Sequence, residues 1–71
     1  MERVRVQSSN LKSIGYDIST STLEVEFTNC RVYQYFNVSV TVCEQLLNAY
    51  SKGSYFSNHI KNRYRFRQIR G

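Results

Sequence analysis

The stretch LEVEF, residues 23–27, decides the fold of this chain, because it alternates cleanly between apolar and acidic residues. Leu23, Val25 and Phe27 fall on one side of an extended segment, and the two glutamates between them fall on the other. Such alternation predicts a half-buried strand whose glutamates lie on the solvated side. A polar turn separates it from RVYQYF, residues 31–36, which is rich in β-branched and aromatic residues and predicts a further strand.

An earlier segment, SIGYD at residues 13–17, places Ile14 and Tyr16 on one side of an extended backbone. The polar turn STST, residues 19–22, joins this segment to the alternating strand. Three such runs with short turns between them predict an antiparallel meander.

After Val38 the apolar residues follow a helical spacing instead. Ser39 alone, or Thr41 with Glu44 at the spacing of a capping box, offers an N-cap. Gly53 either ends this helix or begins a turn. The residues that share one face of the predicted helix are Cys43, Leu46, Leu47 and Tyr50.

A second, shorter helix is predicted over SYFSNHIK, residues 54–61. Tyr55 and His59 are separated by i, i+4 in this segment, so they lie on the same side of a helix. Phe56 and Ile60 repeat that spacing one residue later and predict a buried pair.

The C-terminal segment, residues 61–71, carries the whole excess of positive charge. The formal net charge is +5, and residues 1–60 contain as many acidic as basic side chains. Three arginines alternate with two aromatic residues here, which predicts an edge strand with a wet basic side. Because arginines can hold phosphates and rings can stack on bases, we predict a nucleic-acid-binding segment. Its candidate residues are Lys61, Arg63, Tyr64, Arg65, Phe66, Arg67 and Arg70.

These segments together predict one α+β domain over residues 1–71, since a chain of this length has room for a single core. We expect a three-stranded meander, extended to four strands if the basic segment adds to an edge, with one or two helices on one face. The helices can cover only one side of residues 31–36. Because Gln34 interrupts the other side, we expect Tyr33 and Tyr35 to pack beneath the helices; the alternative is that these rings face a ligand.

The sequence offers little chemistry beyond binding. His59 is the one histidine, and its spacing from Cys30 and Cys43 matches no zinc motif. We therefore expect a non-catalytic protein with no metal, cofactor or small-molecule substrate. No apolar run indicates a signal peptide or a membrane span, so we also expect a cytoplasmic protein with free thiols.

With these segments placed, the sequence resembles the KTSC domain family, whose members stand alone or are appended to the C-terminus of some lysyl-tRNA synthetases. The family often has proline where this chain has Arg65, and the freed N–H there allows the tail to extend as a strand. The resemblance implies no catalytic or cofactor residue. The motifs that carry it are SSN at 8–10, SIGYD at 13–17, LEVEF at 23–27, VYQYF at 32–36 and SKGSYFSNHIKNRY at 51–64.

The association with a tRNA synthetase and the basic segment together favour a small accessory domain that binds RNA, either tRNA or single-stranded RNA. Sequence specificity should be weak, because little in the segment could read base edges. The alternative is a protein–protein interaction or homodimerisation module that acts through an exposed sheet edge.

Overall fold

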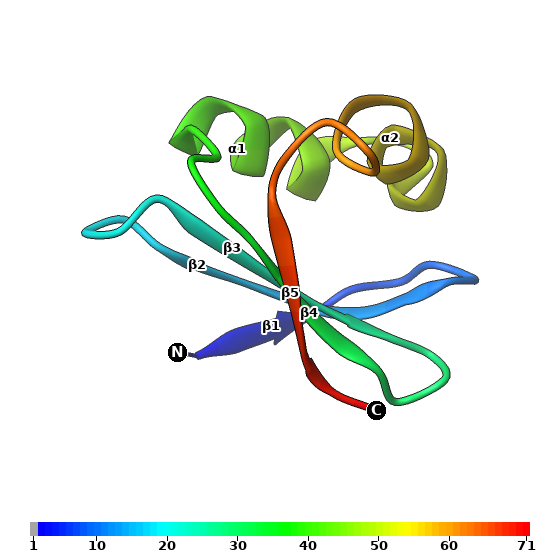
Figure 1. Cartoon of the computed structure of the whole chain (residues 1–71). Helices are drawn as coiled ribbons and strands as arrows, with labels where there is room; N and C mark the ends of the chain where they lie inside the picture. Colours follow the sequence, from blue (N-terminus) through cyan, green and yellow to red (C-terminus); the bar gives the residue numbers. More distant parts are fainter. Residues whose placement is uncertain (1) are drawn as a thin grey trace.

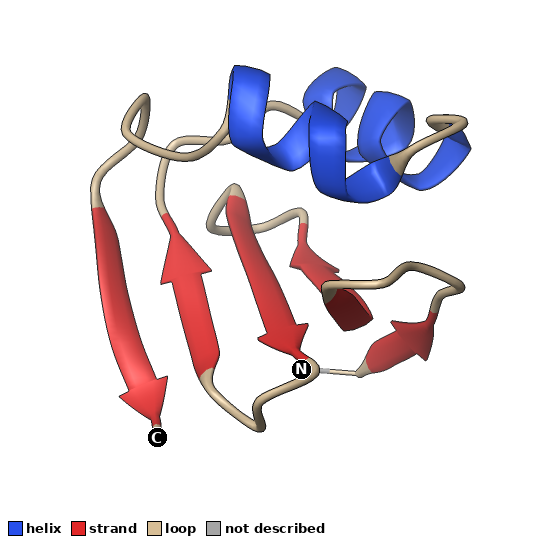
Figure 2. Ribbon diagram, turned by 90° about the vertical axis from the view of Figure 1, so that its right-hand side faces the viewer, coloured by secondary structure: helices blue, strands red, loops and turns tan. Residues whose placement is uncertain are grey.

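The computed structural model describes residues 2–71 and contains a five-stranded sheet with two helices. Neighbouring strands are antiparallel and follow the order β1-β2-β3-β4-β5. Both helices cover the same face of the sheet (Figures 1 and 2), so the predicted α+β class and meander are confirmed. The elements are β1 (Arg3–Arg5), β2 (Leu11–Asp17), β3 (Thr22–Phe27), β4 (Val32–Tyr35), α1 (Val40–Asn48), α2 (Lys52–His59) and β5 (Phe66–Arg70).

The strand that the sequence did not predict is β1, which pairs with β2 so that Arg3 lies opposite Gly15. It has three residues, two of them arginines, and Val4 remains 64% exposed. A strand this short carries no readable alternation. The strand β5 is the edge strand that the sequence predicted, and it pairs antiparallel with β4.

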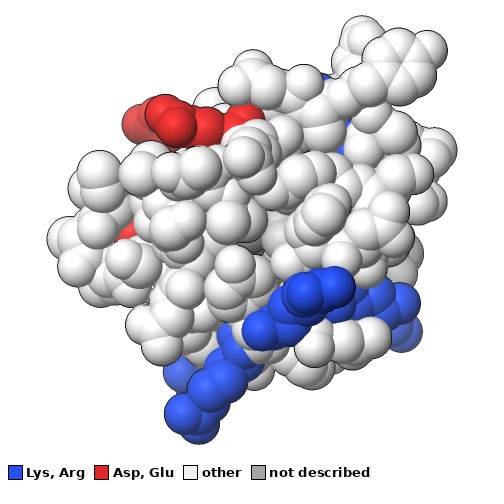
Figure 3. All heavy atoms as spheres, turned by 90° about the horizontal axis from the view of Figure 1, so that it is seen from above, with Lys and Arg blue, Asp and Glu red and all other residues white. Residues whose placement is uncertain are grey.

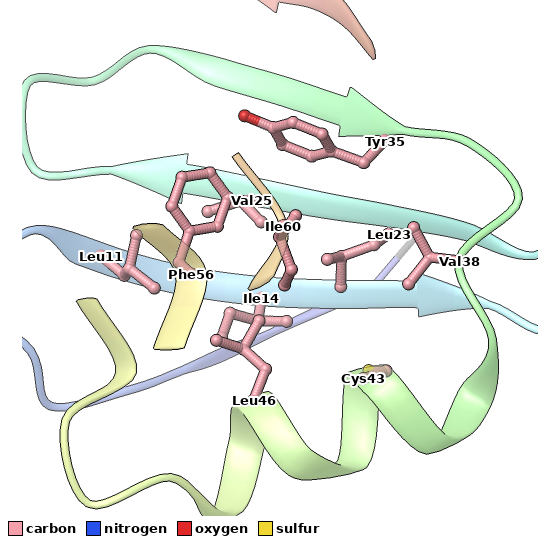
Figure 4. Packing of buried hydrophobic residues seen from close by; sticks show 10 residues of the cluster. All are labelled: Leu11, Ile14, Leu23, Val25, Tyr35, Val38, Cys43, Leu46, Phe56 and Ile60. Carbon is pink, nitrogen blue, oxygen red and sulfur yellow. The ribbon is translucent and has the colours of Figure 1, made fainter. Parts of the chain in front are cut away.

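The core lies between the helices and the sheet. Figure 4 shows Cys43 and Leu46 pointing from α1 toward the sheet, where Leu23 and Val25 of β3 are fully buried. Phe56 supplies a large apolar side chain from α2. Each such side chain stabilises the fold by about 1.5–3 kcal/mol when fully buried.

The helices cover the side of β4 that carries the two tyrosines. Tyr35 lies opposite Leu23 and is buried, and Tyr33 lies opposite Val25 and is half-buried. Both rings belong to the core or pack against it, so the expected placement of this pair is confirmed.

Ser39 is the N-cap of α1, and its hydroxyl accepts a hydrogen bond from the Val42 N–H at 3.3 Å. Cys43 and Leu46 of the predicted helical face are buried and Leu47 lies in α1 at 37% exposed, but the prediction that Tyr50 belongs to this face was wrong. The helix ends at Asn48, and the chain then becomes extended at Ala49, so Tyr50 points fully into solvent.

Gly53 lies in the first turn of α2 rather than at the end of α1. The Ser51 hydroxyl caps this helix by accepting from the Ser54 N–H at 3.3 Å. A Cβ at Gly53 would lie 3.3 Å from the side-chain nitrogen of Asn10, so the missing side chain allows the loop before β2 to approach the helix closely. The predicted i, i+4 pairing of Tyr55 with the histidine is present, with ring centroids 4.5 Å apart.

The β3 glutamates lie on the face of the sheet opposite the helices. The expectation that they are solvated was wrong, because both are buried. Glu24 is 5% exposed and Glu26 is 9% exposed. Arg3 reaches across β2 to pair with Glu24, which also accepts from the Gln34 amide at 2.9 Å. The reason is that side chains from both edges of the sheet fold over β3 and shield its carboxylates from water.

Candidate nucleic-acid interface

A groove of about 460 Å³ lies on the helix-covered side of the sheet, between α2 and the strands β3, β4 and β5. The loop before β2 contributes Asn10 to its wall, and the turn between β3 and β4 contributes Asn29. The turn after α2 adds Asn62, whose φ of 66° is a left-handed conformation that asparagine tolerates. Segments far apart in the sequence therefore meet around one opening.

Five aromatic side chains line the groove and contact one another. The Tyr33 and Tyr35 rings are nearly parallel, with centroids 6.3 Å apart. Phe66 tilts against both of them, at 5.7 Å from Tyr33 and 5.9 Å from Tyr35. These contacts form one continuous aromatic surface, whose members are Phe27, Tyr33, Tyr35, Phe56 and Phe66.

The exposure of these rings increases from one side of the aromatic surface to the other. Tyr35 and Phe56 are each 5% exposed and meet edge to face at 5.4 Å. Phe66, on the edge strand, is 55% exposed. The buried rings thus hold a platform whose outer ring remains available for contact.

The deep part of the groove is uncharged. Burial raises the pKa of Tyr35 to about 12, and the neighbouring Tyr33 adds to that shift. The direction of this shift reflects how deeply the Tyr35 side chain is buried, and the hydroxyl is neutral at pH 7, as that of an ordinary tyrosine is.

Two cations border this aromatic surface. Arg31 precedes β4, and Lys61 follows α2. The three ion pairs found among residues 2–71 involve Arg3 and Arg70, not these two side chains. Both charges at the groove therefore have no ion-pair partner among the described residues.

Local hydrogen bonds place the groove walls. The Ser8 hydroxyl accepts from the N–H groups of Asn10 and Leu11, at 3.3 Å each, and shapes the loop before β2. In the turn between β3 and β4, the Asn29 side-chain oxygen accepts from the Arg31 N–H at 3.1 Å. The SSN motif and the turn residues therefore act as supports for the groove.

Lys61 and Phe66 are the predicted binding residues that the structure brings to the groove. Tyr64 is half-buried and packs against the core. Arg63 lies in the turn after α2, where its N–H donates to the Ile60 carbonyl at 3.1 Å. The expectation that Arg63 shares one side of a strand with the next two arginines was wrong, because β5 begins only at Phe66.

Arg67 and Arg70 both lie in β5, yet they have different surroundings. Arg67 lies opposite Gln34, on the open side of the sheet, and remains exposed. Arg70 pairs with Glu26 at 2.7 Å and donates to the Cys30 carbonyl at 3.2 Å. Arg70 thus contributes to the fold, whereas Arg67 has its charge in solvent.

Viewed from the helix side, Lys and Arg side chains gather in a band along one edge of the molecule, and the acidic side chains in view lie away from it (Figure 3). All four cations of residues 61–67 are exposed. We call these four residues, Lys61, Arg63, Arg65 and Arg67, the basic edge.

The binding residues predicted from the sequence leave out most of the groove, although the sequence left open that the Tyr33 and Tyr35 rings face a ligand. Arg31, Tyr33 and Tyr35 line it, and so does Phe27 at the end of the neighbouring strand. The signal that could have found them is the density of aromatic residues in two strands that a short turn pairs.

The remaining chemistry of residues 2–71 is sparse. No three His, Cys, Asp or Glu residues in this range are grouped so that they could hold a metal ion. Among the described helices, none has the length and apolar character needed to span a bilayer. Both cysteines are free, as predicted, with Cys30 exposed and Cys43 buried.

Comparison with known proteins finds two kinds of relatives. A family model described as the KTSC domain matches residues 7–64. The chain is 41% identical over 66 residues to a lysine–tRNA ligase of Trichormus variabilis. The aligned region covers 93% of this chain but 12% of the ligase. It is 43% identical over 70 residues to an uncharacterized protein of Stutzerimonas stutzeri, covering 97% of this chain and 99% of that protein.

Among solved structures, a KTSC domain protein from Yersinia pestis superposes with a TM-score of 0.94 at 37% identity. The match covers 96% of each chain. This fold therefore occurs as a small protein of similar length, and a similar sequence occurs as a minor part of a much longer ligase.

Proposed function

We propose that this chain, which belongs to the KTSC domain family, is a small non-catalytic accessory domain that binds RNA. The basic edge would contact phosphates, and exposed rings beside it would contact unpaired bases. Binding of this kind depends on charge and stacking, so it tolerates many sequences.

One observation carries the proposal: the segment that supplies Lys61 and Phe66 to the aromatic groove also carries three more exposed cations, none of them in an ion pair among residues 2–71. Proteins that bind single-stranded nucleic acid commonly combine a positively charged track with rings on which bases stack. Here the cations come from residues 61–67 and the outermost ring is Phe66, within the same segment. One RNA strand could therefore contact both the cations and the Phe66 ring.

The relatives support a tRNA as the first RNA to test. Several are lysine–tRNA ligases, although this chain spans only 12% of their length. The activity of a whole ligase is not carried over to so small a part. What we carry over is the ligand class alone, as part of the proposal.

The test is the salt dependence of binding to single-stranded RNA and to bulk tRNA, measured by fluorescence anisotropy. Four phosphate contacts from the basic edge predict a log–log slope of about −2.8 on a single strand, at about −0.7 per contact. Replacing Arg63, Arg65 and Arg67 together by Ser should reduce the slope to about −0.7.

The matched control removes charge from the other end of the sheet, on β1 and β2, through Arg5→Ser with Lys12→Ser. Both residues are exposed and border a shallow depression on the open side of the sheet. This control should leave the slope unchanged. Undetectable binding at low salt, or equal losses in both variants, would contradict the proposal.

A second candidate function rests on the free edge of β5. All five residues of this strand are exposed, and Ile69 is 45% exposed on it. Such an edge can accept a strand from a partner or from a second copy. Light scattering separates the two proposals, because a dimer that persists at high salt would favour the interaction module.

A further inference from the structure

We infer that the groove is a pocket for one unpaired nucleobase, with the adjoining phosphate held between Arg31 and Lys61. The inference rests on the proposed RNA binding and names where a base would enter. It assigns recognition to a cavity built from four elements rather than to the basic edge alone.

The dimensions of the groove suit a ligand of this class. Its volume of about 460 Å³ lies within the range of roughly 300–1,000 Å³ that small-molecule sites occupy. The groove is lined by both α2 and β5, the edge strand of the sheet, and the Phe66 ring is 55% exposed there. A planar aromatic ligand can therefore reach that ring without unfolding either element.

The rings are held in place before any ligand arrives. Phe27 meets the Tyr33 ring edge to face at 5.7 Å, and the Tyr35 ring stacks nearly parallel to the Tyr33 ring. The Tyr33 hydroxyl donates to the Gln68 side-chain oxygen at 3.3 Å, which ties the ring to the edge strand. A base that stacks on Phe66 and Tyr33 would meet a surface with little freedom left to lose, and such preorganisation favours binding.

The groove also carries hydrogen-bonding groups and charges that suit the rest of a nucleotide. The side-chain amides of Asn10 and Asn62 border it, and each amide offers both a donor and an acceptor to a base edge. Arg31 and Lys61 come from different elements and are free of the ion pairs seen among residues 2–71. A phosphate linked to the bound base is an anion that these two charges would attract.

The test compares two RNA probes and three protein variants by fluorescence anisotropy. The probes are a short single-stranded RNA and the same strand in which every position is abasic. Phe66→Leu keeps an apolar side chain and removes the ring, whereas Phe66→Tyr restores the ring. Tyr50→Ala is the matched control, because Tyr50 is fully exposed and lies outside the groove.

We expect Phe66→Leu to weaken binding of the intact RNA by about 5- to 150-fold, which is the value of one base stack. Phe66→Tyr should retain the affinity, and Tyr50→Ala should change nothing. The abasic strand should bind the native protein at least as weakly as the intact strand binds Phe66→Leu, because it loses every base contact and not the Phe66 stack alone. Thermal unfolding of each variant checks that the fold persists.

Two results would overturn the inference, and they are distinguishable from each other. If the native protein binds intact and abasic strands equally well, RNA is held by phosphates alone and the groove takes no base. If neither strand binds at low salt, the proposed RNA binding itself fails.

Discussion

On the open face of the sheet Arg3 and Arg70 pair with glutamates of β3, whereas the basic edge has no ion-pair partner among residues 2–71. Both groups consist of cations on strands or turns at the periphery of the sheet. The difference comes from where the acids lie in space, because Glu24 and Glu26 on β3 are within reach of Arg3 and Arg70. One set of charges ties the sheet edges to β3, and the other is exposed to solvent.

The two faces also differ in how they exclude water. On the helix side, rings and aliphatic side chains form the core, and the stability comes from burial. On the open side, polar side chains cover two carboxylates with hydrogen bonds and ion pairs that remain partly accessible to solvent. Removing a side chain should therefore lower the free energy of unfolding more on the helix side than on the open side.

The largest expected effect comes from Tyr35→Ala, which removes a buried ring that contacts three others. Aromatic-to-alanine changes in a core typically cost about 3–5 kcal/mol. We expect a loss of that size in the free energy of unfolding, measured with urea. The control Tyr50→Ala should stay within about 0.5 kcal/mol, because that ring is fully exposed. Equal losses in the two variants would show that the helix-covered face is not the core.

A smaller effect should appear on the open face at acid pH. The Ser13 hydroxyl donates to Glu26 at 2.8 Å and lowers the pKa of that carboxyl below its usual 4.5, with Lys12, Arg3 and Arg70 adding to the shift. Because the folded state favours the ionised form, this stabilisation is present above the unfolded pKa and is lost as the pH falls through the lowered folded value.

The measurement is the free energy of unfolding of the native protein and Glu26→Gln as the pH is lowered from neutral. The native protein should lose stability more steeply below about pH 4.5 than the variant does. Part of the decline should remain in the variant, because hydrogen bonds from Ser19 also lower the pKa of Asp17. Identical pH profiles would mean that the Glu26 contacts contribute nothing to the fold.

The smallest effects provide the sharpest comparison, because Arg67 and Arg70 lie three residues apart on one strand. Arg70→Ser should lower the free energy of unfolding by at most about 1 kcal/mol, as expected for an exposed ion pair. It should leave the salt dependence of RNA binding unchanged. Arg67→Ser should do the reverse: the slope should decrease in magnitude by about 0.7 with stability within about 0.5 kcal/mol.

Thermal unfolding and anisotropy titrations on the same two variants measure both quantities. If each substitution changed stability and salt dependence alike, the division between structural and ligand-facing arginines would be incorrect.

Much of the fold could be predicted from local pattern. The alternation of residues 23–27 marks β3, and the spacing of Cys43 and Leu46 marks α1. The caps and β1 could not be predicted with the same certainty. Ser39 and Thr41 are equally good caps in sequence, and a three-residue strand is stabilised by its partner rather than by its own composition.

The groove could be predicted only in part, because it depends on contacts between distant residues. Lys61 and Phe66 stand out in the basic segment, but Tyr33 and Phe56 join them only when β4, β5 and α2 come together. The buried glutamates escaped prediction for the same reason. Arg3 and Arg70 reach them from opposite edges of the sheet, which no local pattern shows.

The central claim is that RNA binds at the groove and the basic edge. The most direct test is a titration of the isotope-labelled protein with a short single-stranded RNA, followed by NMR chemical-shift mapping. We predict the largest shift changes at Arg31, Tyr33, Lys61 and Phe66, with smaller changes at the other three residues of the basic edge. Shift changes centred on Arg5 and Lys12 of β1 and β2, or none at low salt, would contradict the account.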